Sequence, residues 1–182
     1  MNRSLDIHQD EALVAELHRL GVRHLVRLQP DIAHPPMSPT QLIVGLASHR
    51  QARFRAALIL LFLRRPSQSG IALTVGQSLA GPPANTLRLN YQAAAYLRPE
   101  LDAELQKISD DAVPLPDLFS AELGLPAVGS VRAETALTAL GDIHRRLSGR
   151  AYNWAGSYRQ HIPLFLRQLR RSAQIAHRLE HA

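Results

Sequence analysis

The most constraining feature of the sequence is an unbroken apolar run, Ala56–Leu63, with arginines close to both of its ends. A helix built from this run has no polar face, so protein must cover it on every side. A fully buried strand is the alternative, but the Ala-Ala step, a span of about 15 residues and the stop at Pro66 favour a helix. The run is too short to cross a bilayer, which takes about 20 apolar residues. We therefore expect a buried central helix that the rest of the chain covers.

Length and composition set the broad class of the protein. A chain of 182 residues can form one domain that buries about 70% of its unfolded surface. The absence of cysteine excludes disulfides, thiolate zinc sites and cysteine nucleophiles. Asp6, Asp10 and Glu11 lie where a signal peptide needs an apolar core, and no later stretch is long enough to span a membrane. We expect a cytoplasmic protein that does not contact membranes.

Start and stop signals divide the N-terminal part into helical hairpins. Ser38, Pro39 and Gln41 form a capping box with proline at the first helical position, which opens a helix packed on the central one. A second hairpin follows, with a cap at Asn85 in its second arm and a break or restart at Pro99. Short and long helices in successive hairpins are typical of HEAT- or TPR-like arrays, and an irregular bundle is the alternative.

Two short segments carry a weak strand signal. Val22–Leu28 follows a first helix that Ser4 could cap and Gly21 could end, and it alternates apolar with basic residues. Ile71–Val75 precedes Gly76–Ala80, which is a near miss of the serine-hydrolase nucleophile elbow. That motif needs a mostly parallel sheet, and the remaining chain offers no run of strands to build one. We do not expect a hydrolase.

A proline-rich connector, residues 111–129, separates an N-terminal helical lobe, 1–110, from a C-terminal basic lobe, 130–182. In the C-terminal lobe Ser130 is the expected cap of a helix that ends at Gly149. The predicted fold is all-α, with helical hairpins packed around a buried central helix and a C-terminal helical pair. We expect the lobes to form one compact domain.

The net charge of +6 comes entirely from the C-terminal part of the chain. Residues 1–131 hold twelve basic and twelve acidic side chains, whereas residues 132–182 hold nine arginines and three acids. Arginines spaced by three and four on the last helix can follow phosphates or a carboxylate-rich surface, and nearby aromatic rings could stack bases. The alternative is a solvated basic face with the single Trp as a core anchor. The candidate contact residues are Arg150, Arg159, Arg167, Arg170, Arg171, Arg178, Trp154 and Tyr158.

Histidines on the last helix carry two further patterns. His177 and His181 have the spacing of a metal-binding pair, but no third ligand accompanies them in the sequence. Arg170 or Arg171 followed by His177 resembles the signature of HEPN-type helical ribonucleases, in which the pair contacts and cleaves the RNA backbone. The chain contains five such Arg-His pairs, where chance gives about three. We predict no catalytic residue, no metal and no cofactor, and keep the ribonuclease as an alternative.

Three parts of the chain together carry a resemblance to a group of proteins. They are the helix, short joint and apolar helix of 42–63, the helix of 87–100 with Asn90 and Tyr91, and the aromatic segment 152–158. In this combination the chain resembles uncharacterised all-helical bacterial proteins associated with genes for minimal nucleotidyltransferase domains. The resemblance implies an accessory or antitoxin-like role.

The sequence favours a non-enzymatic interaction protein that binds a protein partner, or a second copy of itself, through the basic C-terminal helix. Binding of RNA or DNA by the same basic face is the second hypothesis. A helical ribonuclease that uses Arg171 and His177 is the third.

Overall fold

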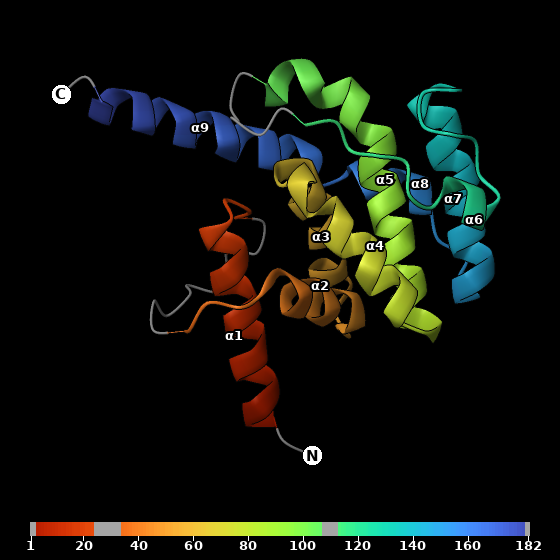
Figure 1. Ribbon diagram of the computed structural model, residues 1–182, viewed down its shortest axis with the longest axis horizontal. Helices are drawn as coiled ribbons and strands as arrows, with labels where there is room; N and C mark the ends of the chain where they lie inside the picture. The colour runs from red at the N-terminus through yellow and green to blue at the C-terminus, as the bar shows by residue number, and fades with distance from the viewer. Residues whose placement is uncertain (1–2, 24–33, 107–112, 181–182) are drawn as a thin grey trace.

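The computed structural model describes residues 3–23, 34–106 and 113–180, and the regular structure in these ranges is entirely helical (Figure 1). The predicted all-α class is confirmed, while the finer likeness to HEAT or TPR arrays stays a prediction. None of the described helices is long and apolar enough to cross a membrane. The elements are α1 (Arg3–Arg19), α2 (Pro39–Ser48), α3 (Ala52–Arg64), η1 (Pro66–Gln68), α4 (Ser69–Ser78), α5 (Gly81–Leu105), α6 (Ser120–Leu123), α7 (Ala133–Ser148), α8 (Trp154–Arg159) and α9 (Ile162–Glu180).

The predicted central helix is α3, and it lies in the middle of the molecule (Figure 1). Ala57–Leu63 is buried without interruption, and α3 packs against both α2 and α5. Burial of each large apolar side chain contributes about 1.5 to 3 kcal/mol, so this run supplies much of the driving force for folding. One hydrophobic cluster joins α3 to residues of α7 and α9. The proposed division into lobes stays a prediction.

The joint between α2 and α3 places the residues that precede the apolar run. The capping box at the start of α2 forms as predicted, with the Gln41 N–H donating to Ser38 Oγ (3.2 Å) and the Ser38 N–H donating to Gln41 Oε1 (2.9 Å). At the other end of α2, His49 Nε2 lies 2.7 Å from Asp10 Oδ1 on α1. The chain then enters α3 at Ala52. This tight joint fixes where the side chains of the first turn of α3 emerge.

The strand interpretation of Ile71–Val75 is wrong, because this segment lies within helix α4. Tertiary packing overrides the local β preference: Ala72, Val75 and Gly76 form one buried helical face. Phe119 lies so close to Gly76 that an added Cβ would meet its ring at 3.0 Å. Because Gly76–Ser78 is helical, the strand-turn-helix setting of a nucleophile elbow is absent there. The other candidate strand, Val22–Leu28, lies outside the described residues from position 24 onward.

Helix α5 is longer than the sequence predicts at both of its ends. It begins at Gly81 rather than at a cap on Asn85, because prolines fit the first helical turn, where no N–H bond is needed. It also continues through Pro99 to Leu105. The buried Arg98 holds this region in place by donating from Nε to Asp102 Oδ1 (2.5 Å) and from Nη1 to Leu63 O (3.0 Å). These contacts offset the backbone hydrogen bond that Pro99 cannot make.

A polar cluster on one side of α5 fixes the connector to the helix, and we call it the Asp117 cluster. Asp117 accepts hydrogen bonds from Gln92 Nε2, Ser120 N, Ser120 Oγ and Val128 N, over distances of 2.7 to 3.3 Å. Gln92 also accepts from the Phe119 N–H (3.3 Å). Burial alone would raise the pKa of Asp117, but the hydrogen bonds from Val128, Ser120 and Gln92 outweigh it and lower this pKa. The cluster therefore favours the charged carboxylate.

The C-terminal helices hold an excess of basic over acidic residues, with nine arginines and three acids in residues 132–182. Helix α7 begins at Ala133 with Arg132 as its cap residue, so the predicted cap at Ser130 is wrong; Ser130 Oγ instead donates to Ala127 O (2.7 Å). Gly149 ends α7 in the left-handed conformation, as predicted (φ 66°). Helix α7 packs against α5 and α8. The C-terminal half of α9 extends beyond the other helices in Figure 1.

Candidate anion-binding cleft

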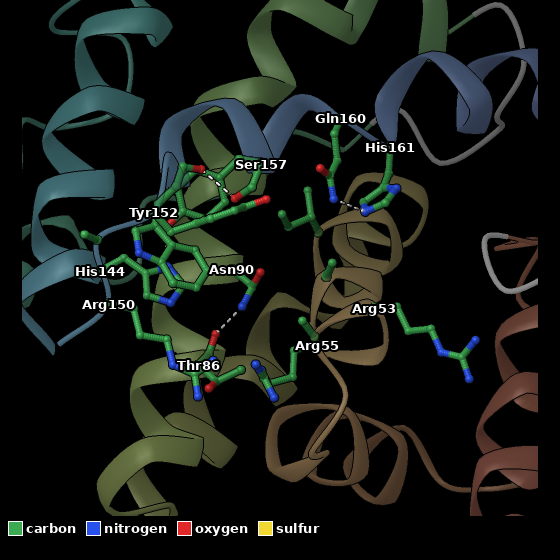
Figure 2. Close-up of a pocket in the computed structure, with 16 residues that line it drawn as sticks. Arg53, Arg55, Thr86, Asn90, His144, Arg150, Tyr152, Ser157, Gln160 and His161 are labelled. Atoms are coloured by element: carbon green, nitrogen blue, oxygen red, sulfur yellow. Dashed lines mark hydrogen bonds between the residues drawn. The ribbon is translucent and has the colours of Figure 1, made fainter. Parts of the chain in front are cut away.

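Two adjoining cavities, each of about 470 Å³, form one recess lined by residues of α3, α5, α7 and α8, and we call it the arginine cleft. The start of α3 forms one side, the first half of α5 forms the floor, and the segment from α7 to α8 forms the other side (Figure 2). The residues that line both cavities are Arg55, Thr86, His144, Arg150 and Trp154.

Arg55 is a half-buried cation that the protein holds in a fixed position. Its Nη1 donates to His49 O (2.8 Å) and to Arg50 O (2.7 Å), the carbonyl groups where α2 ends. A cation at the C-terminal end of a helix is stabilised by the helix dipole. Burial lowers the pKa of Arg55, and the positive charge of Arg150 lowers it further. The guanidinium stays charged at any physiological pH because its ordinary pKa is so high.

Arg150 reaches the same recess from the opposite side. Figure 2 shows Arg55 and Arg150 on either side of Thr86, approaching from α3 and from the α7–α8 joint. The Arg150 side chain is exposed and makes no hydrogen bond or ion pair with a described residue. The described residues that line the two cavities include no carboxylate. Arg55 and Arg150 therefore place two positive charges in the part of the cleft that both cavities share, where no described carboxylate neutralises them.

Stacked aromatic rings make one wall of the cleft. The His144 ring stacks on the Trp154 ring with 3.5 Å between centroids, and His144 Nδ1 lies 2.8 Å from the Tyr158 hydroxyl. Tyr152 meets the Trp154 ring edge-on at 5.0 Å. Burial, followed by the charge of Arg55, lowers the pKa of His144 to about 4. His144 is therefore neutral at pH 7, and burial raises the pKa of Tyr158 so that it stays protonated.

Asn90 forms part of the cleft floor from α5. Its side chain is only 6% exposed, and its Nδ2 donates to Thr86 O one turn earlier (2.7 Å). No described residue donates a hydrogen bond to Asn90 Oδ1, and Figure 2 shows the amide within the open space of the cleft. A buried side-chain amide normally uses its donor and acceptor capacity fully. Asn90 thus leaves polar capacity available to a bound molecule.

Three further side chains define the rim of the cleft. Gln160 and His161 face it from the joint of α8 and α9 (Figure 2), with Gln160 Nε2 2.6 Å from His161 Nε2. Burial lowers the pKa of His161, so this ring also stays neutral at pH 7. Arg53 turns away toward α1 in Figure 2, and its guanidinium lies 5.4 Å from the centroid of the Phe54 ring. Arg53 therefore lines the cleft with the aliphatic part of its side chain, while its guanidinium group points away from the cleft.

The structure divides the eight contact residues that the sequence predicts. Arg150, Trp154 and Tyr158 line the arginine cleft. Arg159 and Arg170 lie elsewhere, on a groove between α5 and α9 that Arg167 also lines. Arg159 pairs there with Glu100 (2.7 Å), and Arg170 pairs with Glu104. The remaining two, Arg171 and Arg178, are exposed on α9 away from both recesses.

The predicted basic face is therefore partly neutralised by the protein itself. Acidic residues of α5 pair with two of the arginines of the C-terminal part, although the two groups lie about sixty residues apart in the sequence. In the charge count along the sequence, Glu100 and Glu104 belong to residues 1–131, whose net charge is zero. Only the fold brings the opposite charges together.

Arg55, His144 and Asn90 are cleft residues that sequence reasoning did not select. The segment Arg50–Arg55 holds three arginines directly before the apolar run, and that is the one signal that could have pointed to the cleft. A cation within one turn of a buried helix must emerge next to whatever packs on that helix. No local pattern marks His144 as a cleft residue, because its partners Trp154 and Tyr158 lie beyond the turn that ends α7.

The metal and ribonuclease patterns receive no structural test. His177 lies within α9, but its side chain is outside the described set, and so is His181. No group of three or more potential metal ligands occurs among the described residues.

The chain matches no protein-family model, and neither the curated proteins nor the solved structures contain a significant match to it.

Proposed function

We propose that this protein is a non-enzymatic binding protein that holds a phosphate-type anion in the arginine cleft. The observation that carries the proposal is the presence of Arg55 and Arg150 in one recess whose described lining contains no carboxylate. A guanidinium group presents paired N–H donors that match phosphate and carboxylate oxygens.

The electrostatics of the cleft support an anionic occupant. The positive charge of Arg150 lowers the pKa of Arg55, which means that the two cations repel one another across the recess. An anion between them replaces this repulsion with attraction. Because backbone carbonyls already hold Arg55, little side-chain freedom is lost when the anion binds.

The arrangement of the cleft favours binding over catalysis. His144 is neutral at pH 7, but one ring face is stacked on Trp154 and Nδ1 is held by Tyr158. The Ser157 hydroxyl donates to Trp154 O (2.7 Å) instead of approaching a histidine. A nucleophile next to a base, with a third group that orients the base, is the usual arrangement for covalent catalysis. The described side chains of the cleft do not form such a series.

Calorimetric titration with inorganic phosphate at low ionic strength tests this proposal. We expect saturable heat for the wild type and at least tenfold weaker binding for Arg150→Ala, since a charge-assisted hydrogen bond contributes about 1.5 to 3 kcal/mol. Arg178→Ala is the matched control, because it removes the same charge from the exposed end of α9. Equal binding by Arg150→Ala and the wild type, or no binding by either, would overturn the proposal.

A second candidate function is contact with a macromolecular partner along α9, as the sequence predicts. Arg167, Arg171 and Arg178 are exposed and form no ion pair with a described residue, and Leu164 and Ile175 are exposed on the same helix. These features support a partner that is acidic and partly apolar. The accessory or antitoxin-like role, self-association and nucleic-acid binding all remain proposals for this face.

Ionic strength separates the possible partners of α9. Binding of RNA or DNA must weaken steeply as salt rises, because counterions are released from the phosphates. We expect a triple variant, Arg167→Ala with Arg171→Ala and Arg178→Ala, to reduce that slope by about three if the partner is a nucleic acid. If the triple variant and the wild type bind a labelled oligonucleotide with equal affinity, nucleic-acid binding by α9 is excluded.

A further inference from the structure

We propose that the arginine cleft is a site for a nucleoside monophosphate unit, with the phosphate between the two arginines and the base against the aromatic wall. This inference rests on the proposed anion binding and specifies the chemistry of the rest of the ligand. The unit could be a free nucleotide or the phosphorylated end of a nucleic-acid strand, since both present the same groups.

The two ends of the cleft differ in chemistry in the way that such a ligand requires. Arg55 and Arg150 lie at one end, beside Thr86, where Figure 2 shows them on either side of an open space. The rings of Tyr152, Trp154 and His144 lie on the adjoining wall, with Ile59 among the apolar residues opposite. A phosphate group joined to a planar base can contact both the arginines and the aromatic wall. Inorganic phosphate would contact the arginines alone.

The aromatic wall is suited to stacking because it is preformed. His144 supports the Trp154 ring, so the indole does not need to be ordered when a ligand arrives. Tyr152 is 52% exposed while it touches the edge of the same ring, which leaves much of its surface free. The Trp154 Nε1–H is buried, and no described residue accepts a hydrogen bond from it.

Asn90 supplies a polar group of the kind that recognises the edge of a base. It is more than nine-tenths buried, yet its Oδ1 receives no hydrogen bond from a described residue and its amide faces the cleft. The second N–H of Nδ2 is also available, because only one is needed for Thr86 O. A donor and an acceptor side by side is the pattern with which asparagine contacts base edges. An apolar or purely anionic ligand would leave this capacity unused.

The size of the cleft agrees with a ligand of this class. Each of the two adjoining cavities has a volume of about 470 Å³, within the range of about 300 to 1,000 Å³ that is typical of small-molecule sites. The two cavities share the arginines, the histidine and the tryptophan. A strand end could therefore place one nucleotide in one cavity and continue toward the other.

Calorimetric titrations with AMP, UMP, ribose 5-phosphate and adenosine test the inference. We expect at least one of the two nucleotides to bind ten times more tightly than ribose 5-phosphate or more, because stacking of one base adds about this factor. Adenosine, which has no phosphate, should bind at least tenfold more weakly than AMP. Equal binding of ribose 5-phosphate, AMP and UMP would overturn the inference but leave anion binding intact. No binding of any phosphate compound would overturn both.

Tyr152→Ala shows whether the ring wall makes the difference. The side chain is exposed, so we expect the variant to fold normally and to lose at least fivefold in affinity for AMP while its affinity for ribose 5-phosphate stays unchanged. Ile7→Ala is the control, since Ile7 is similarly exposed (54%), lies on α1 and lines neither cavity of the cleft. An AMP affinity that is equal in Tyr152→Ala and the wild type would contradict a base on this wall.

A 5′-phosphorylated trinucleotide, compared with AMP and with the unphosphorylated trinucleotide, separates the two sources of the ligand. Tighter binding of the phosphorylated trinucleotide than of AMP assigns the site to a strand end. Weaker binding assigns it to a free nucleotide. Equal binding of the phosphorylated and unphosphorylated trinucleotides, when both exceed AMP, would overturn the proposed role of the terminal phosphate.

Discussion

Asn90 and Gln92 are two residues apart on α5, and both are buried amides, but they belong to different kinds of polar site. Gln92 joins the Asp117 cluster, where its Nε2 donates to Asp117 and its Oε1 accepts from Phe119 N. Asn90 bonds only its own helix through Thr86 O and faces the arginine cleft. The protein supplies hydrogen-bond partners for both the N–H and the oxygen of the Gln92 amide. The Asn90 amide keeps an oxygen and one N–H that no described residue uses.

The charged groups of the two sites differ in the same way. Asp117 receives four hydrogen bonds from the protein, and together they lower its pKa. In the arginine cleft the Arg150 guanidinium receives no partner from the described residues, and a second cation lies across from it. Charges that a protein satisfies itself stabilise the fold, whereas charges left without partners are typical of ligand sites. The comparison therefore separates a structural cluster from a functional one.

Gln92→Ala should cause the largest loss of stability, because it removes a side chain of the Asp117 cluster that bonds α5 to the connector. It leaves the buried Phe119 N–H without an acceptor and creates a cavity, so we expect a loss of about 3 kcal/mol in the free energy of unfolding. For a chain of this length that loss corresponds to a melting temperature about 10 °C lower, measured by circular dichroism. Asn90→Ala should lose less than about 1.5 kcal/mol, since it breaks no bond between helices. Equal losses in the two variants would remove the distinction.

The pH dependence of the melting temperature tests whether His144 is buried as a neutral ring in the wall of the arginine cleft. Its pKa in the folded protein is about 4, below the ordinary value of 6.5, so the folded state favours the neutral ring. The resulting stability is complete above pH 6.5 and is lost as the pH falls from 6.5 toward 4. We expect the melting temperature to decrease across this interval in the wild type and to decrease less in His144→Gln. The same pH dependence in both proteins would show that His144 is not buried as a neutral group.

Asp117 should show its effect at lower pH. Because hydrogen bonds lower its pKa, its contribution to stability is present above its ordinary pKa and is lost as the pH falls through the lowered value. Asp117→Asn should therefore be less stable than the wild type at pH 7, by about 1 to 2 kcal/mol. Once the pH is low enough to protonate the wild-type carboxyl, the difference in urea midpoint should shrink. A difference that grows on acidification would be inconsistent with a charged cluster.

The surface ion pair of Arg159 with Glu100 should have the smallest effect. Both side chains are about 40% exposed (42% and 43%), and such pairs contribute less than about 1 kcal/mol. Arg159→Ala should thus lower the urea midpoint only slightly and leave phosphate binding unchanged. Its double variant with Glu100→Ala should behave like the single one. Loss of phosphate binding would mean that the functional surface extends from the cleft to the α5–α9 groove.

The sequence predicts the parts of this fold that depend on local patterns. The apolar run identifies α3 as the central helix, and the capping box at Ser38 places the start of α2. The errors at Ile71–Val75 and Pro99 arise where tertiary contacts override local preference: Phe119 against Gly76 for α4, and the bonds of Arg98 for α5. The error at Asn85 is local, because the prolines before it fit the first turn of α5.

The candidate site is predicted less completely than the fold. Trp154, Tyr158 and Arg150 were selected because they are close in sequence, and they do lie together. Arg55 and Asn90 come from α3 and α5, and only helix packing brings them to the same recess. The pairing of α9 arginines with Glu100 and Glu104 is equally non-local. A count of charges along the sequence cannot distinguish Arg159 and Arg170, which form ion pairs, from Arg150, which faces the cleft.

The emission of Trp154 during a titration with inorganic phosphate at constant ionic strength tests the central claim most directly. Trp154 is the only tryptophan in the chain and lines the cleft beside Arg150, so its fluorescence reports this site alone. We predict a saturable change in emission whose midpoint equals the calorimetric Kd and which Arg150→Ala abolishes. Calorimetric binding without any change in Trp154 emission would place the anion elsewhere and contradict the account.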